Sequence, residues 1–152
     1  MSGGRREDVE SIDAIVTAMY ANISGPAGER DWERERFLYM PGARLQPTRP
    51  KPEGGATMDV FDFEGYAASR APHFREQPFY EKEVARRIER FGNVAHVWST
   101  YEGRRSPDGE PFLRGINSIQ LFHDGDRWWV VSVLWDNERE GNPLPEKYRT
   151  SG

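Results

Sequence analysis

The chain has 152 residues, a net charge of −4, no cysteine, and a composition that is 36% apolar and 30% charged. This length fits one domain that buries about two thirds of its unfolded surface, and the mixed charge predicts neither a nucleic-acid surface nor a basic membrane patch. No apolar run reaches the roughly 18 residues of a membrane span, and disulfides, thiolate metal sites and a cysteine nucleophile are excluded.

The first ten residues, MSGGRREDVE, lack the apolar core of a signal peptide. We therefore expect a cytoplasmic protein. The predicted domain covers residues 1–152, with a core at about 8–138 and a C-terminal tail at 139–152.

Two helices are predicted near the N-terminus. Asp8 is a suitable cap for the first, which the segment SGPAG at 24–28 ends. The segment DWERERF at 31–37 begins a short second helix, with Asp31 as its cap. Apolar residues recur at helical spacing in the first helix: Val9, Ile12, Ile15, Val16, Met19, Tyr20 and Ile23.

The next segment, ARLQPTRPKPEGGATMDVF, begins as a strand and is predicted to continue as a loop. Its three closely spaced prolines and its Gly-Gly pair argue against regular structure between about 46 and 56. Such a loop is either a plain connector or a lid over a site. A third helix is predicted over 62–74, capped by Asp62 and broken near Pro72.

The segment FYEKEVARRIERF at 79–91 carries two conflicting patterns. Its composition favours a helix, but a Phe-Gly-Asn turn and three β-rich runs follow it, at 93–105, 112–122 and 127–135. A helix there would leave the predicted sheet one strand short, so we predict a strand. The last run, RWWVVSVLW, is apolar at almost every position, which indicates that both of its faces are covered.

This order of elements resembles the nuclear transport factor 2-like superfamily, which includes SnoaL-like cyclases and ketosteroid isomerases. The resemblance covers about residues 8–138 and is carried by the segments DWERERFLYMPGARLQP and RGINSIQLFHDGDRWWVVSVLWDNE. It implies an α+β fold in which three N-terminal helices pack on a strongly curved, mainly antiparallel mixed sheet, a cystatin-like cone with an internal pocket. A scaffold of this kind hosts unrelated activities.

The resemblance also implies a homodimer that packs through the outer face of the sheet. The two-sided apolar strand is consistent with this arrangement, because monomers seldom expose large apolar patches. The alternative is a monomer whose outer tryptophans are shielded by the C-terminal tail.

Side-chain alternation decides which strand residues reach the pocket. A type I turn in FHDGD, with Gly125 in a left-handed bulge, aligns Asn117 and Ile119 with the face of Val131, Val133 and Trp135. A two-residue Asp-Gly turn would place Ser118 on that face instead. The resemblance directs the Asn117 face inward, and the expected ligand-binding residues are Tyr20, Tyr39, Ser99, Tyr101, Asn117, Val133 and Trp135.

Where the isomerases carry their catalytic base, this chain has Gln46 or Pro47. Asn117, which falls at or near their protonated aspartate, donates a hydrogen bond but does not take up a proton. Two other residues are candidates for acid–base catalysis. His73 ends the third helix near the pocket opening, and Asp136 follows the last strand; the plain interpretation of each is a solvated surface group.

No histidine or acidic cluster has metal-ligand spacing, so we expect neither a metal nor a cofactor. Three functions remain open. The first is binding of a small hydrophobic metabolite in an aromatic-lined pocket, and the second is an isomerase, cyclase or lyase that uses the same pocket. The third is a protein-interaction domain. Neither nucleic acid nor a membrane is an expected partner.

Overall fold

A computed structural model describes residues 3–151; residues 1, 2 and 152 of the predicted domain lie outside the described part. Six strands form one mixed sheet in the order β2-β1-β6-β5-β4-β3, in which only β1 and β6 pair in parallel. The strands are β1 (Tyr39–Pro50), β2 (Ala56–Met58), β3 (Tyr80–Phe91), β4 (Val94–Arg104), β5 (Leu113–His123) and β6 (Trp128–Asn137). The helices are η1 (Arg6–Val9), α1 (Ile12–Ile23), α2 (Trp32–Arg36), α3 (Phe63–Glu76) and η2 (Glu146–Tyr148).

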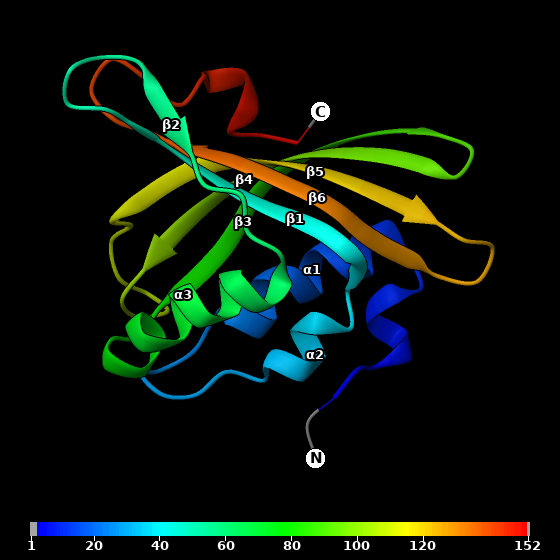
Figure 1. Cartoon of the computed structure of the whole chain (residues 1–152). Coiled ribbons are helices and arrows are strands. Elements are labelled where there is room, and N and C mark those ends of the chain that lie inside the picture. The colour runs from blue at the N-terminus through cyan, green and yellow to red at the C-terminus, as the bar shows by residue number, and fades with distance from the viewer. Residues whose placement is uncertain (1–2, 152) are drawn as a thin grey trace.

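The three α-helices cover one face of the sheet (Figure 1). The α+β prediction is therefore confirmed, including the three helices and the mixed sheet. The sheet is twisted rather than strongly curled (Figure 1), so the expected strong curvature is not supported. The main core lies between α1 and the sheet, where Ile15 and Val16 meet Val97 and Ile119, all fully buried.

The start of the first helix differs from the prediction. Ser11, not Asp8, caps α1, because its side chain accepts a hydrogen bond from the backbone N–H of Ala14. Asp8 lies in η1, where it is buried and accepts two bonds from the Arg34 guanidinium, at 2.8 and 3.0 Å. The predicted cap of α2 is confirmed: Asp31 accepts from the backbone N–H of Arg34 at 3.0 Å.

The third helix continues beyond the predicted break. Asp62 caps it as expected, accepting from the backbone N–H of Gly65 at 2.7 Å, but the helix runs through Pro72 to Glu76. A proline removes only its own N–H from the helical ladder, and the later bonds still form. The N–H of Gln77 accordingly donates to the carbonyl of His73 at 3.0 Å.

The predicted loop between 46 and 56 is mostly strand. β1 continues to Pro50 and pairs with β2, so only 51–55 form the turn. Pro47 has no N–H to donate, but its carbonyl accepts from the N–H of Asp59 at 3.0 Å, so the pairing continues past it with one bond fewer. The long loop that we considered as a lid is therefore a hairpin.

The strand predicted at 79–91 is confirmed as β3, with a bulge between Glu83 and Ala85. The last hairpin has the predicted pairs of Asn117 with Trp135 and of Ile119 with Val133, and Gly125 has a φ of +100°. The placement of Val131 on that face is wrong. A second bulge shifts the register by one residue, so Val130 is fully buried while Val131 is 37% exposed.

The C-terminal tail lies on the sheet face opposite the helices (Figure 1). The Tyr148 ring packs edge-on against Trp98, with centroids 5.7 Å apart, and the Thr100 hydroxyl donates to the Tyr148 carbonyl at 2.7 Å. Shielding of an outer tryptophan by the tail is thus seen at Trp98.

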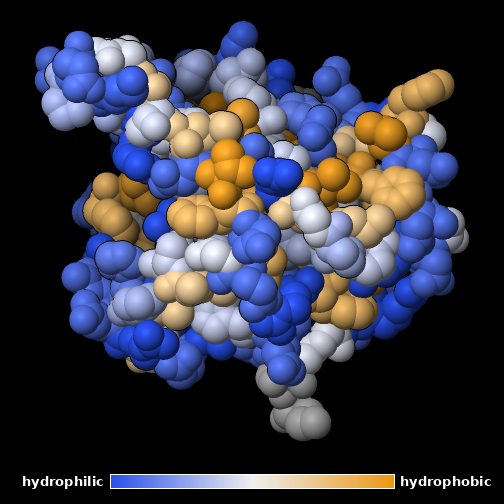
Figure 2. All heavy atoms as spheres, in the orientation of Figure 1, coloured by the Kyte–Doolittle hydropathy of each residue, from blue (hydrophilic) through white to orange (hydrophobic). Residues whose placement is uncertain are grey.

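Other outward-facing side chains of the sheet remain uncovered, and apolar atoms are visible among charged ones over the sheet (Figure 2). On β6, Val131 and Leu134 are 37% and 39% exposed. The homodimer through this face stays a prediction. None of the described helices has the length and apolar character to span a bilayer.

Gly115 allows a close approach of neighbouring atoms at the inner face of the sheet. A Cβ at Gly115 would lie 2.3 Å from the Tyr101 hydroxyl and 2.4 Å from the Asp136 carbonyl. We expect Gly115→Ala to lower the free energy of unfolding by about 1–3 kcal/mol, because the backbone must shift. Urea denaturation checks this. Gly103→Ala is the control, since its new contacts, at 3.1–3.4 Å, are with side chains; an equal loss in both variants would contradict the expectation.

Candidate functional site

A cavity of about 360 Å³ lies between the helices and the inner face of the sheet. This volume falls at the lower end of the range typical of small-molecule sites, about 300–1,000 Å³. Of the seven expected ligand-binding residues, all but Ser99 line it: Tyr20, Tyr39, Tyr101, Asn117, Val133 and Trp135. Ser99 does not line the cavity, but its hydroxyl forms a hydrogen bond with Tyr20, which does.

Aromatic rings form much of the wall. Tyr66 of α3 meets Trp135 of β6 edge-on, with centroids 6.0 Å apart. Phe74 stacks on Phe79 at 5.4 Å, toward the end of the cavity where α3 terminates. Such rings offer a large apolar surface, which favours a ligand with an apolar, planar body.

A chain of hydrogen bonds fixes the Tyr20 hydroxyl at the inner wall. Asn117 Nδ2 donates to it at 2.9 Å, and the Tyr20 and Ser99 hydroxyl oxygens are 2.7 Å apart. Ser99 in turn donates to the Glu83 carboxylate, so its hydrogen is not available to Tyr20. Tyr20 therefore donates to Ser99 and accepts from Asn117.

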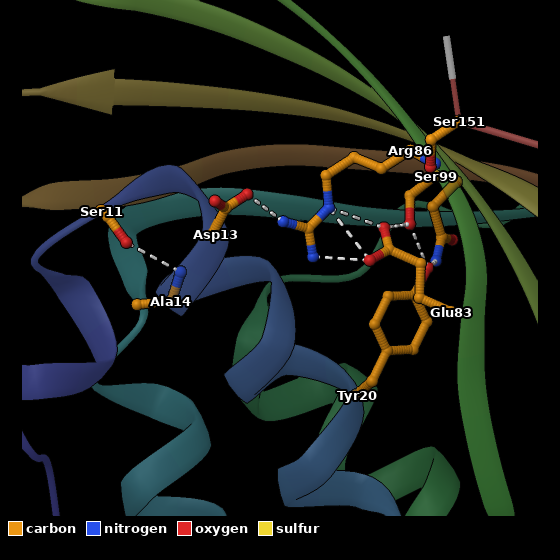
Figure 3. A network of polar contacts seen from close by, with 9 residues as sticks. Ser11, Asp13, Ala14, Tyr20, Glu83, Arg86, Ser99 and Ser151 are labelled. Atoms are coloured by element: carbon orange, nitrogen blue, oxygen red, sulfur yellow. Dashed lines mark hydrogen bonds and ion pairs between the residues drawn. The ribbon is translucent and has the colours of Figure 1, made fainter.

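Glu83 is held in place by Arg86, which also pairs with Asp13 of α1 (Figure 3). The bulge in β3 makes this possible, because it brings Glu83 and Arg86 to the helix side of the sheet together. Figure 3 shows the chain running from Asp13, through Arg86, Glu83 and Ser99, to Tyr20. Asp13 is 80% exposed at its side chain, so the network connects the cavity wall to the surface.

Glu81 is the first acid that sequence reasoning missed. It lines the cavity from β3, where it is partly exposed to the cavity space. Desolvation there raises its pKa to about 8, although the positive charge of Arg70 acts in the opposite direction. Burial first, and the Glu81 carboxylate second, raise the pKa of Tyr20 and of Tyr101, so all three groups share one enclosed space. Among residues 3–151, the side chain of Ser24 bonds to the Glu81 backbone, and no side chain forms a hydrogen bond with the Glu81 carboxyl.

Glu35 of α2 is the second acid at the cavity. It is 2% exposed and accepts a hydrogen bond from the Tyr39 hydroxyl at 3.2 Å. Its other oxygen, Oε1, is buried without a partner in the described part of the chain. Burial raises the pKa of Glu35 to about 8, so this carboxyl is protonated at neutral pH.

Tyr101 and Asn137 form a further polar pair at the wall. The Tyr101 hydroxyl donates to Asn137 Oδ1, which leaves the Asn137 amide N–H groups for another acceptor. Asn137 lines the cavity because it follows Val133 and Trp135 at alternate positions. Sequence reasoning had stopped at Trp135, although the same alternation would have found Asn137.

The two expected catalytic residues lie in different places. His73 lines the cavity at its outer end and is exposed to solvent. Asp136 is not part of the cavity wall: its carboxylate accepts from Arg139 Nη1 at 2.8 Å and from the Asn137 N–H at 2.9 Å. Alternation along β6 directs Asp136 away from the cavity that Trp135 and Asn137 face.

The position of the expected isomerase base carries no acid. Gln46 donates to the Ser132 hydroxyl at 3.0 Å, and Pro47 is buried in the sheet. The acids that line the cavity come from α2, α3 and β3 instead: Glu35, Glu76 and Glu81. No group of three or more potential metal-ligating side chains occurs within residues 3–151.

The sequence matches no protein-family model and no curated protein. Its shape, however, matches solved structures. A protein of unknown function with a cystatin-like fold from Nostoc punctiforme superposes with a TM-score of 0.65 at 10% identity, covering 84% of this chain and 88% of that one. The chain has the NTF2-like, cystatin-like fold.

Two further solved structures superpose on the chain. A protein of unknown function from Mycobacterium tuberculosis matches with a TM-score of 0.65 at 14% identity, covering 89% of this chain and 75% of that one. A candidate ketosteroid isomerase from Shewanella frigidimarina matches with a TM-score of 0.55 at 13% identity, with coverage of 80% and 91%. At these identities the comparison establishes the fold, and function has to be argued from the site.

Proposed function

We propose that this protein is an enzyme that binds a small, largely apolar carbonyl compound and transfers a proton within it. The observation that carries the proposal is Glu81, a carboxyl group that faces an aromatic cavity, accepts no side-chain hydrogen bond from the described residues and has a pKa of about 8. A general base works best when its pKa lies near the working pH.

The expected reaction begins with the ionised form of Glu81. Its carboxylate removes a proton from a carbon next to the carbonyl, and the C–H electron pair forms a C=C bond while the carbonyl electrons move onto oxygen. The carboxylic acid then returns the proton to the same carbon, or to a conjugated one, which restores the carbonyl. Return of the same proton to a conjugated carbon gives isomerisation. When the carboxyl group exchanges its proton with water before returning one to carbon, the outcome is proton exchange, and water is the only further reactant.

Neutral amides are available to stabilise the negative oxygen. Asn117 Nδ2 carries two hydrogens and uses one of them on Tyr20, so the second can be donated to a ligand oxygen. Tyr101 donates to the amide oxygen of Asn137, so this bond does not use the Asn137 amide hydrogens, which can be donated to a ligand. Donors fixed in an enclosed site favour the charge that develops in the transition state.

Loss of label from a deuterated ketone tests this proposal. We would incubate the protein in water with 1-tetralone that is deuterated next to its carbonyl, and follow the loss of deuterium by NMR. We expect a protein-dependent rate at low ketone concentration that rises about tenfold per pH unit below pH 8 and becomes constant above it, because only ionised Glu81 is a base.

Label loss no faster than in buffer would contradict catalysis and leave ligand binding as the function of the cavity. A rate independent of pH between 6 and 9 would contradict Glu81 as the base. Circular dichroism at each pH verifies that the protein is folded during the assay.

A further inference from the structure

Two arginines from separate segments of the chain line the cavity. Arg70 of α3 and Arg105, just after β4, both line the cavity. Arg70 has no ion pair within 4 Å among residues 3–151, but at longer range its positive charge acts to lower the pKa of Glu81 and of Asp59. Its guanidinium lies 5.5 Å from the centre of the Tyr66 ring.

Arg105 is held at the rim by its surroundings. Its guanidinium lies 4.1 Å from the centre of the Phe112 ring, and Nη1 donates to the Pro78 carbonyl at 3.1 Å. No other hydrogen bond joins this guanidinium to a residue within 3–151, so its remaining N–H groups are unused there. Stacking on a ring restricts the side chain, so less freedom is lost when it binds an anion.

Few negative charges oppose these two arginines. Glu35 and Glu81 line the cavity, but with pKa values of about 8 both are protonated at neutral pH. Glu76 at the rim is exposed. Arg70, Arg105 and Glu76 together carry one net positive charge, which matches one carboxylate better than a dianionic phosphate.

We propose that the ligand of this cavity is a small apolar monocarboxylate. Its carboxylate lies at the rim between Arg70 and Arg105, and its apolar body extends inward along Tyr66 and Trp135. Guanidinium groups bind carboxylates through paired, charge-assisted hydrogen bonds. This inference rests on the proposed function, because it names the class of substrate for the same cavity: an acid that carries its reacting carbonyl farther inside, near Asn117.

Two probes of nearly the same shape, one charged and one neutral, show how much the carboxylate charge contributes to binding. 2-Naphthoate and the neutral 2-naphthamide have nearly the same body, and calorimetric titration at pH 6.5 gives both dissociation constants. We expect naphthoate to bind about tenfold more tightly than naphthamide, since charge-assisted bonds exceed neutral ones. Arg70→Met should abolish this preference and leave the affinity for naphthamide unchanged.

Two further variants make the test specific. Arg75→Met is the matched control: Arg75 is on the same helix, pairs with Glu29 at 3.2 Å and does not line the cavity, so the preference should persist. Arg105→Met, at an exposed rim position, should reduce the preference to a smaller extent and covers the case in which Arg70→Met fails to fold.

The probe titrations test the monocarboxylate inference, and the ketone assay tests the proposed function. Equal binding of both probes, or a preference that survives Arg70→Met and Arg105→Met, overturns the monocarboxylate inference while the ketone assay of the proposed function stands. If neither probe binds, the inference also fails, and the label-loss assay then judges the proposed function separately.

Discussion

Replacement of Glu81 by glutamine should lower the rate of label loss from 1-tetralone by about 10²–10⁴-fold, the usual contribution of a positioned general base. Glutamine keeps the size of the side chain but does not take up a proton. The cavity and its neutral donors remain, so the affinity for naphthamide should change little. NMR measurement of label loss at pH 8 checks this expectation.

The matched control for this variant is Glu89→Gln. Glu89 is an exposed acid on the same strand, β3, and lies outside the cavity. Its replacement should leave the rate of label loss within about twofold of the original, since surface substitutions change little. If Glu81→Gln and Glu89→Gln had the same rate as the unchanged protein, the role of Glu81 would be disproved.

The second large effect concerns stability and pH, and it arises from Glu35. Its pKa rises from 4.5 in a solvated chain to about 8 in the folded protein, because burial disfavours the charged form. Between these two values the folded state binds a proton that the unfolded state has lost. The free energy of unfolding therefore falls as the pH rises, by about 1.4 kcal/mol per pH unit for one such group.

The contribution of Glu35 is fully present below pH 4.5, is lost as the pH rises, and stays lost above about 8. Glu81 acts in the same direction, with a pKa of about 8. Urea denaturation at several pH values from 5 to 9 measures the slope. We expect Glu35→Gln to remove roughly half of it and to be several kcal/mol more stable than the unchanged protein at pH 9.

The control for this prediction is Glu33→Gln, which replaces an exposed carboxyl on the same short helix. It should leave the slope unchanged. A free energy of unfolding that stays constant between pH 5 and 8 in the unchanged protein would contradict the buried, protonated state of Glu35.

Much of the inner wall of the cavity could be predicted from the sequence, because it depends on alternation along strands. Once Asn117 was aligned with Trp135, Val133 was also assigned to the inner face, and the pairing of β5 with β6 confirms this register. The same reasoning gave the wrong face for Val131, because a bulge shifts the alternation by one residue. No residue type in the sequence marks this bulge.

The acids of the site were harder to find. Glu81 lies in a segment rich in charge, where pairing with neighbouring arginines is the usual explanation for an acid. Glu35 lies in a short charged helix, whose composition is typical of a solvated surface. Each was missed because a carboxyl is normally exposed. Their burial follows from how α2 and β3 pack around the cavity, which no spacing within either segment reveals.

The α+β class, the order of the main helices and strands, and the pairing of Asn117 with Trp135 and of Ile119 with Val133 were predictable from the sequence, because alternation and turn residues indicate them. The strand at 79–91 followed from the strand count and not from its own composition, which favours a helix. Which polar groups share the cavity follows from tertiary packing and not from any local pattern. Glu35, Glu81 and Arg70 come from three separate elements, and their charge states depend on distances and burial that arise only when those elements pack together.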